Sequence, residues 1–145
     1  MPELTEEERE ELESSLLELN RGGALIEALS KQVALLNASL SELSFTMEAI
    51  KKLREAPEGA EILTPIGSGS FVRAKLMPLE KVLTGVGADV VVERTPEEAL
   101  KFLEEKSSEV GKAVQDLRAE MAKLTQRMEA LRPEIEKLLS KSRER

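Results

Sequence analysis

The sequence has no cysteine, histidine, tryptophan or tyrosine, and only three of its 145 residues are phenylalanine. The missing cysteine and histidine exclude a disulfide framework, a thiolate or imidazole metal site, and a nucleophile–base pair built on either side chain. Aspartate is also scarce, because every acidic residue except Asp89 and Asp116 is a glutamate. We therefore expect a protein that is not an enzyme, with no catalytic, cofactor-binding or metal-ligating residue.

The chain also lacks an excess of basic residues and any long apolar run. Its net charge is −7, whereas nucleic-acid and anionic-membrane surfaces are bound by basic stripes or clusters. No stretch approaches the roughly 20 apolar residues that span a bilayer, and the acidic N-terminus is unlike a signal peptide. We expect a cytoplasmic protein that binds neither nucleic acid nor membrane. Its abundant Glu, Lys and Arg are typical of thermophile proteins, and also of long surface helices.

Apolar residues recur with heptad spacing in the first third of the chain. One series occupies every seventh position over residues 12–47, and a second series, three residues later, is apolar from Leu29 onward. These are the a and d positions of a coiled-coil seam. The d series contains Ser15 and Gly22 at its N-terminal end. The pattern predicts a helix over about residues 4–54.

The last third of the chain repeats the pattern more regularly. Residues 100–138 place an apolar side chain at every a and d position except one. Thr95 suits the N-cap, Pro96 suits the first helical position, and Glu98 completes a capping box with Thr95. The pattern predicts a helix over about residues 96–140.

Two helices of this length need a partner for their seams. Each would be roughly 70 Å long at 1.5 Å per residue, and a narrow a/d stripe cannot be buried by a lone helix. We predict that the two helices fold back on each other as an antiparallel coiled coil. Both chain termini would then lie at one end of it, here called the terminal end.

The middle of the chain shows no helical period and holds most of the glycines. Four short β-rich pieces lie at residues 62–66, 71–77, 81–84 and 89–94. Turn signals separate them at Gly67-Ser68-Gly69, at Pro78 and at Gly85-Val86-Gly87. A phosphate-binding loop is a poor interpretation of "GSGS" at 67–70, because no lysine follows at the required spacing. The sequence predicts two consecutive β-hairpins.

The predicted fold is therefore α+β, a long antiparallel two-helix coiled coil with two β-hairpins at its base. The regions are a coiled-coil helix at 1–57, the hairpins at 58–94 and a second coiled-coil helix at 95–145. Four short strands with no covering helix leave an apolar face and open edges. We expect the hairpins of several subunits to join in a continuous sheet or an oligomeric β-barrel. The predicted oligomerisation residues are Ile62, Leu63, Ile66, Phe71, Val72, Ala74, Leu76, Val82, Leu83, Val90, Val91 and Val92.

The terminal end carries more apolar residues than a two-stranded seam can bury, and exposed apolar patches usually mark interaction sites. The predicted binding residues are Leu12, Leu16, Leu17, Leu19, Leu25, Met128, Leu131, Ile135, Leu138 and Leu139. The alternative is a wider stripe buried in a helical bundle with another subunit. Gly22, Gly23 and Pro133 each weaken a helix at a similar height. They suggest a soft joint between a rigid stem and a looser terminal end; local tolerance of a poorly packed end is the alternative.

The segments "ILTPIGSGSFVRAKL" (62–76) and "VLTGVGADVVVERTPEEALKFLEEK" (82–106) resemble the prefoldin family, and specifically its archaeal α-type subunits. The likeness lies in a Pro-hydrophobic-Gly turn, a Phe-led strand, a Gly-hydrophobic-Gly turn and a hydrophobic strand ending in Glu. The Ala99-Leu100 pair then follows in a capped helix. Two hairpins rather than one favour the α type over the β type.

The resemblance implies an ATP-independent chaperone. In the family, two α-type and four β-type subunits form a hexamer whose hairpins build a β-barrel. Six coiled coils hold non-native polypeptides at their ends and pass them to a group II chaperonin. The implied partners are thus β-type subunits, unfolded clients and a group II chaperonin. Relatives called γ prefoldins instead assemble with themselves into filaments through their β regions, which is the alternative for this chain.

Overall fold

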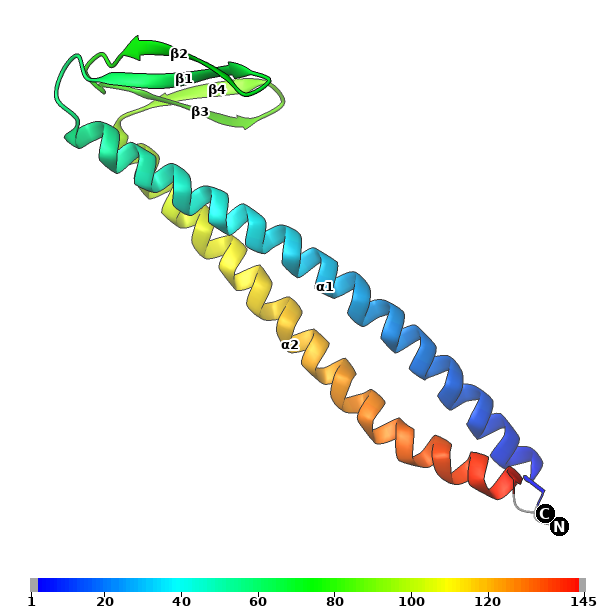
Figure 1. The fold of residues 1–145 in the computed structure, drawn as a ribbon. Helices are drawn as coiled ribbons and strands as arrows, with labels where there is room; N and C mark the ends of the chain where they lie inside the picture. The colour runs from blue at the N-terminus through cyan, green and yellow to red at the C-terminus, as the bar shows by residue number, and fades with distance from the viewer. Residues whose placement is uncertain (1–2, 144–145) are drawn as a thin grey trace. The chain divides into compact units, whose positions relative to one another are not determined.

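The computed structural model describes residues 3–143. Two long helices, α1 (Glu6–Glu55) and α2 (Pro96–Arg143), flank four strands in the order α1-β1-β2-β3-β4-α2 (Figure 1). The chain divides into two compact units. The first combines α1 up to residue 38 with α2 from residue 111, and the second comprises residues 39–110. The predicted pair of long helices with two intervening hairpins is confirmed.

Both helices begin with a capping box. The Thr95 hydroxyl accepts a hydrogen bond from the Glu98 N–H at 3.1 Å, and the Glu98 carboxylate accepts one from the Thr95 N–H at 3.3 Å. These reciprocal bonds satisfy donors that have no partner inside the helix. Thr5 and Glu8 form the same arrangement ahead of α1. The capping box at Thr95 was predicted and the one at Thr5 was not, although both have the sequence T-x-x-E.

The strands form two separate antiparallel hairpins. Their bounds are Glu61–Gly67 for β1, Ser70–Lys75 for β2, Val82–Gly87 for β3 and Val90–Arg94 for β4. Leu63 pairs with Arg73, and Thr64 pairs with Val72. Successive side chains on a strand point to opposite faces. Apolar residues therefore lie on both faces of the first hairpin, not on one alone.

The second turn lies further along the chain than the sequence suggested. Gly85-Val86-Gly87 was predicted as the turn, but β3 continues through Gly87 and the chain reverses at Ala88 and Asp89. Both residues have positive φ angles, 50° and 60°, which is uncommon for residues other than glycine. The first hairpin turns on the equivalent pair, Ser68 and Gly69. A register shift precedes each turn, so the two hairpins share one design.

The core of the second unit joins the helices to the start of β3. Leu43 and Ile50 of α1 cluster with Ala99 and Leu103 of α2, and Ala99 is completely buried. Leu79 of the segment between the hairpins packs against this cluster. This packing ties the second hairpin to the helices.

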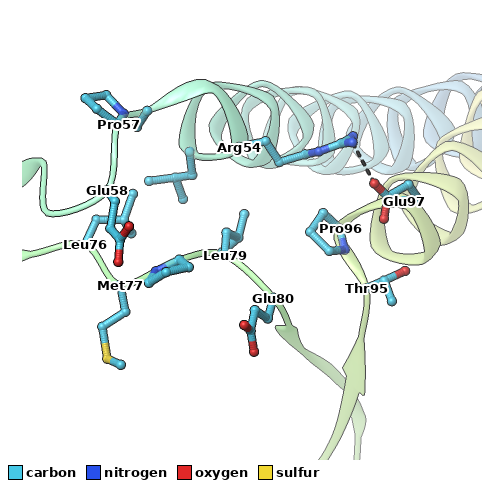
Figure 2. Close-up of a pocket in the computed structure, with 13 residues that line it drawn as sticks. Arg54, Pro57, Glu58, Leu76, Met77, Leu79, Glu80, Thr95, Pro96 and Glu97 are labelled. Atoms are coloured by element: carbon cyan, nitrogen blue, oxygen red, sulfur yellow. Dashed lines mark hydrogen bonds and ion pairs between the residues drawn. The ribbon is translucent and has the colours of Figure 1, made fainter.

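A shallow cavity of about 450 Å³ lies beside this junction (Figure 2). Arg54, near the end of α1, donates a 2.6 Å hydrogen bond to Glu97 in the first turn of α2. Leu79 points toward the helices, whereas Met77 points away from them and is 79% exposed. Both partners of the ion pair are well exposed, so its contribution to stability is small.

The guanidinium of Arg94, the last residue of β4, lies over the ring of Phe102 in α2, 3.8 Å from its centroid. Its Nη1 atom is buried and has no hydrogen-bond partner among residues 3–143. Stacking on an aromatic face thus replaces hydrogen bonding for part of this side chain. The contact fixes the end of the second hairpin against α2.

In the first unit, α1 and α2 run antiparallel. Glu8 contacts Lys141 while Glu18 contacts Arg127, so residue numbers rise along one helix as they fall along the other. The buried α1 residues here are Ser15, Leu29 and Val33, and the buried α2 residues are Val114, Leu131, Ile135 and Leu138. Over the described residues, neither helix is long and apolar enough to cross a membrane.

Candidate functional site

Two ion pairs join the helices at the terminal end. Arg127 donates to both carboxylate oxygens of Glu18, from Nε at 2.7 Å and from Nη2 at 3.2 Å. This contact lowers the pKa of Glu18 and raises that of Arg127. Bidentate geometry of this kind is stronger and more specific than a single contact.

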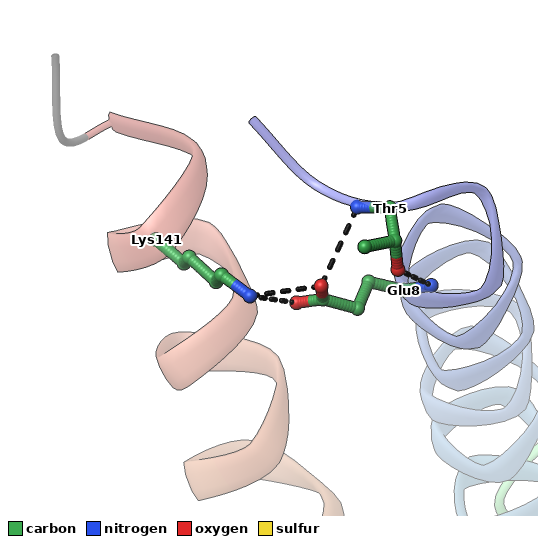
Figure 3. Close-up of polar contacts among 3 residues, drawn as sticks. All are labelled: Thr5, Glu8 and Lys141. Carbon is green, nitrogen blue, oxygen red and sulfur yellow. Dashed lines mark hydrogen bonds and ion pairs between the residues drawn. The ribbon is translucent and has the colours of Figure 1, made fainter. Parts of the chain in front are cut away.

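The second ion pair is built on the capping box of α1 (Figure 3). Lys141 Nζ lies 2.8 Å from both carboxylate oxygens of Glu8, and the Thr5 N–H lies 3.4 Å from one of them. The hydrogen bond from Lys141 is the main cause that lowers the pKa of Glu8, and the bonds with Thr5 add to it. One carboxylate therefore serves both the helix cap and the helix pair.

Three of the ten predicted binding residues are buried in this closed arrangement. Leu131, Ile135 and Leu138, here called the buried trio, are 1%, 5% and 8% exposed. They fill the space between the helices because they occupy the a and d positions of α2. A client cannot contact them while the helices stay packed. In the described structure they are core residues of the first unit, and their predicted contact with clients stays a prediction.

The remaining predicted residues differ in exposure. Leu16, Leu17 and Leu25, here called the exposed leucines, are 38%, 50% and 43% exposed. Partly buried are Leu12, Leu19, Met128 and Leu139. A groove of about 320 Å³ runs beside Leu17 and Leu25, two of the exposed leucines, and its lining is mostly apolar. Its lining residues are Ser14, Leu17, Glu18, Arg21, Gly22, Leu25 and Leu124.

The two glycines lie inside an unbroken helix. A Cβ at Gly22 would lie 3.0 Å from Met128 Sδ and 3.3 Å from its Cγ, closer than normal packing allows. Gly22 therefore makes room for the Met128 side chain. At Gly23 the nearest atom would be Met128 Cε at 3.8 Å, an ordinary contact. A side chain would crowd Met128 only at the first glycine.

Pro133 lies in α2 five residues beyond Met128, or about 7.5 Å along the helix axis. The predicted opposition of Gly22 to the stretch around 128–135 agrees with the contact to Met128. The proline itself lies further toward the terminal end than the glycine does. Whether these three residues act as a joint stays a prediction.

The second candidate surface lies on the hairpins. None of the twelve predicted oligomerisation residues is buried, and six of them are more than half exposed. These six are Leu63 at 66%, Ile66 at 65%, Phe71 at 58%, Leu83 at 66%, Val90 at 52% and Val91 at 58%. Two-stranded sheets with so much apolar surface are stable only when something covers them.

Sequence reasoning missed four other exposed apolar residues. Val86 and Met77 belong to the hairpin region and are 45% and 79% exposed, whereas Leu35 and Phe45 of α1 are 72% and 76% exposed. Leu35 and Phe45 lie outside the a and d series. An apolar residue off the seam was the signal that could have identified them.

Comparison with known proteins places the chain among prefoldins. The family model described as "Prefoldin subunit" matches residues 23–141. The prefoldin subunit alpha of Methanopyrus kandleri is 36% identical over 108 residues, covering 74% of this chain and 69% of that protein. The prefoldin subunit alpha of Methanosphaera stadtmanae is 33% identical over 136 residues, covering 94% and 97%.

A cryo-EM structure of filamentous PFD from Methanocaldococcus jannaschii matches with a TM-score of 0.71 and 29% identity. The match covers 79% of this chain and 94% of that one. This structural similarity supports the predicted fold, a coiled coil with two hairpins, because a solved prefoldin chain has the same architecture. The resemblance drawn from the two hairpin segments is confirmed by these comparisons.

Proposed function

Because the chain belongs to the prefoldin family, we propose that it is a chaperone subunit that holds non-native polypeptides without nucleotide. Its exposed apolar surfaces carry the proposal. One set lies at the terminal end of the helix pair and the other on the hairpins. A helix pair and two hairpins that are complete in themselves would bury these side chains.

The exposed leucines are the proposed client contacts, together with the partly buried Leu139. Leu17 and Leu25 line a mostly apolar groove together with Glu18 and Arg21, and Leu16 adds exposed apolar surface next to Leu17 in the sequence. Non-native polypeptides expose apolar side chains, which such a groove can cover without sequence selectivity. One groove of this size binds weakly, so several subunits must act together, and linkage then raises the overall affinity.

The hairpins are the proposed assembly surface. Apolar residues on both faces of the first hairpin, and open edges on both hairpins, fit pairing with further strands from other subunits. The family resemblance favours β-type subunits as partners, in a hexamer of two α-type and four β-type chains. It also favours delivery of held clients to a group II chaperonin.

The client contacts can be tested with three substitutions, Leu16→Ser, Leu17→Ser and Leu25→Ser, in one chain. A client that aggregates on dilution from denaturant is mixed with the assembled complex, and light scattering is followed. We expect the triple variant to lose most of the suppression of aggregation, because it removes two of the leucines that line the groove and the exposed Leu16 as well. Leu35→Ser, on the same helix and 72% exposed, is the matched control and should suppress aggregation like the parent.

Assembly is checked separately by mass from light scattering, alone and mixed with a β-type subunit. The triple variant should assemble as the parent does, because its substitutions lie outside the hairpins. Undiminished suppression by the correctly assembled triple variant would refute the client assignment. Loss of suppression in the Leu35→Ser control to the same extent would also refute it.

A second candidate function is a structural filament. The match to a filamentous PFD favours it, and the same exposed hairpin residues would form the contacts. A homomeric assembly that lengthens with protein concentration, seen by electron microscopy, would support the filament. A closed particle that forms only with a β-type partner would exclude it.

A further inference from the structure

Glu8 occupies an unusual position in the terminal end. Its carboxylate closes the capping box of α1 with Thr5 and also binds Lys141, in the last turn of α2 (Figure 3). The Glu8 side chain is 21% exposed, the least exposed partner in any ion pair among residues 3–143. A carboxylate held from two sides loses little further freedom when the contact forms, so this pair is better ordered than an ordinary surface pair.

The apolar packing beside this contact is weaker on α1, where Leu12 is only partly buried, than on α2. The two ion pairs bracket the buried trio on α2, which lies between Arg127 and Lys141 in the sequence. On α1 the residue buried between Glu8 and Glu18 is Ser15, which is 6% exposed. Serine buries little apolar area compared with leucine, so the hydrophobic term that closes this end is smaller than in a seam with apolar residues on both sides. Polar contacts therefore account for a larger share of the closure here.

We propose that the Glu8–Lys141 contact is a latch that keeps the terminal end closed, and that its release exposes the buried trio to clients. Opening would add three large apolar side chains to the surface already formed by the exposed leucines. The latch is reversible and depends on charge, so ionic strength and substitution of either partner shift its population. The proposal rests on the proposed holding function, because it regulates the same site.

Thiol labelling can measure the opening directly. The chain has no cysteine, so Ser15→Cys introduces a single thiol of nearly the same size at a buried position. The labelling rate by a maleimide then reports how often this end opens. In that background, Lys141→Gln removes the charge of the latch and leaves the capping box intact. Lys137→Gln is the matched control, because it removes the same charge one turn earlier. Lys137, Lys141 and Glu8 line one surface groove, which is separate from the groove beside Leu17 and Leu25.

We expect Lys141→Gln to raise the labelling rate about twofold to fivefold, the range of an exposed ion pair. Glu8→Gln should do the same, because glutamine can still close a capping box. Salt at 1 M shortens the screening length to about 3 Å and should speed labelling of the parent, with little further effect on Lys141→Gln. Unchanged labelling in Lys141→Gln, or an equal rise in Lys137→Gln, would overturn the latch.

Client suppression of the same variants separates the latch from the function on which it rests. If the parent complex does not suppress aggregation, the holding function fails, while the labelling rates still decide whether the latch exists. If the parent suppresses aggregation and Lys141→Gln labels faster, suppression should become more efficient per mole of complex. Suppression that stays equal despite faster labelling would refute the role of the buried trio.

Discussion

Gly22 and Gly23 are adjacent in α1 but differ in what surrounds them, and this difference makes a sharp prediction. Alanine in place of glycine stabilises a helix interior by about 0.8–1 kcal/mol. At Gly23 the new Cβ would meet only Met128 Cε at 3.8 Å. We therefore expect Gly23→Ala to raise the free energy of unfolding by nearly the whole of that amount.

At Gly22 the same gain is opposed by a steric cost. The new Cβ would lie 3.0 Å from Met128 Sδ, whereas optimal carbon contacts are about 3.5–4.0 Å. Met128 has to leave its preferred rotamer or move by a few tenths of an ångström, at a cost of about 0.5–1.5 kcal/mol. We therefore expect the effect of Gly22→Ala on the free energy of unfolding to lie between a gain of about 0.5 kcal/mol and a loss of about 0.7 kcal/mol. The two alanine variants should thus differ clearly although they sit side by side.

The assay is guanidinium unfolding followed by circular dichroism at 222 nm, at one fixed protein concentration because assembly shifts apparent stability. The decisive measurement is a double-mutant cycle with Met128→Ala. Removing the thioether removes the steric cost, so Gly22→Ala should become as stabilising as Gly23→Ala in that background. Equal stabilisation by the two alanines in the parent chain would refute the close approach of Met128 to Gly22.

The same substitutions address the joint hypothesis when Pro133→Ala is added. Amide exchange over the first turns of α1 measures how often the terminal end opens. If these residues form a soft joint, the Gly22→Ala/Gly23→Ala/Pro133→Ala variant should exchange its amides more slowly and hold fewer kinds of client than the parent. Unchanged exchange and unchanged client capture would leave Gly22 with a packing role alone.

Three further predictions concern other parts of the chain. The pKa values of Glu8 and Glu98 are lowered from 4.5, mainly by hydrogen bonds with Lys141 and Thr95 respectively. The stability that these two carboxylates add to the folded protein is therefore present above pH 4.5 and is lost as the pH falls through their pKa values in the folded state. The denaturant midpoint of unfolding should then fall less on acidification in a Glu8→Gln/Glu98→Gln variant than in the parent. Arg94→Met keeps an apolar stem over Phe102 and removes a buried nitrogen that has no hydrogen-bond partner among residues 3–143, so the free energy of unfolding should stay within about 1 kcal/mol of the parent value. Phe102→Ala should lower the free energy of unfolding by about 2 kcal/mol or more. Phe71→Ser should weaken assembly, measured by light scattering, without reducing helix content, because Phe71 is 58% exposed and lies outside the helices.

Heptad spacing and capping chemistry predicted the helices closely. The predicted start of α2 at Pro96 coincides with the structure, because Thr95, Pro96 and Glu98 each suit one position of a helix N-terminus. Heptad spacing and capping residues are patterns along the chain, so both can be recognised in one sequence without knowledge of the tertiary contacts. The hairpins were also predicted in number and order, since glycine pairs and β-branched residues mark turns and strands locally.

The second turn was misplaced for a physical reason. Glycines at positions 85 and 87 are strong turn signals, but here Gly85 and Gly87 flank a shift in the β3–β4 register. The reversal itself uses Ala88 and Asp89, and alanine is a poor residue for positive φ. Local propensity therefore placed the turn at Gly85 and Gly87. The register in which β3 pairs with β4 instead places it at Ala88 and Asp89.

Exposure was the least predictable property of the candidate site, because it depends on which residues face each other across the helices. Ser15 and Gly22 were read from the sequence as gaps in a seam, and gaps suggest a loose end with its leucines free. The structure shows that small residues on α1 accompany large ones on α2: Met128 packs over Gly22, and the buried trio lies opposite the stretch that contains Ser15. A small residue on one helix leaves room for a large side chain from the other, so the seam stays filled while less apolar area is buried than with two leucines. The terminal end is thus closed but weakly held, which is the condition that a charge-dependent latch at Glu8 requires.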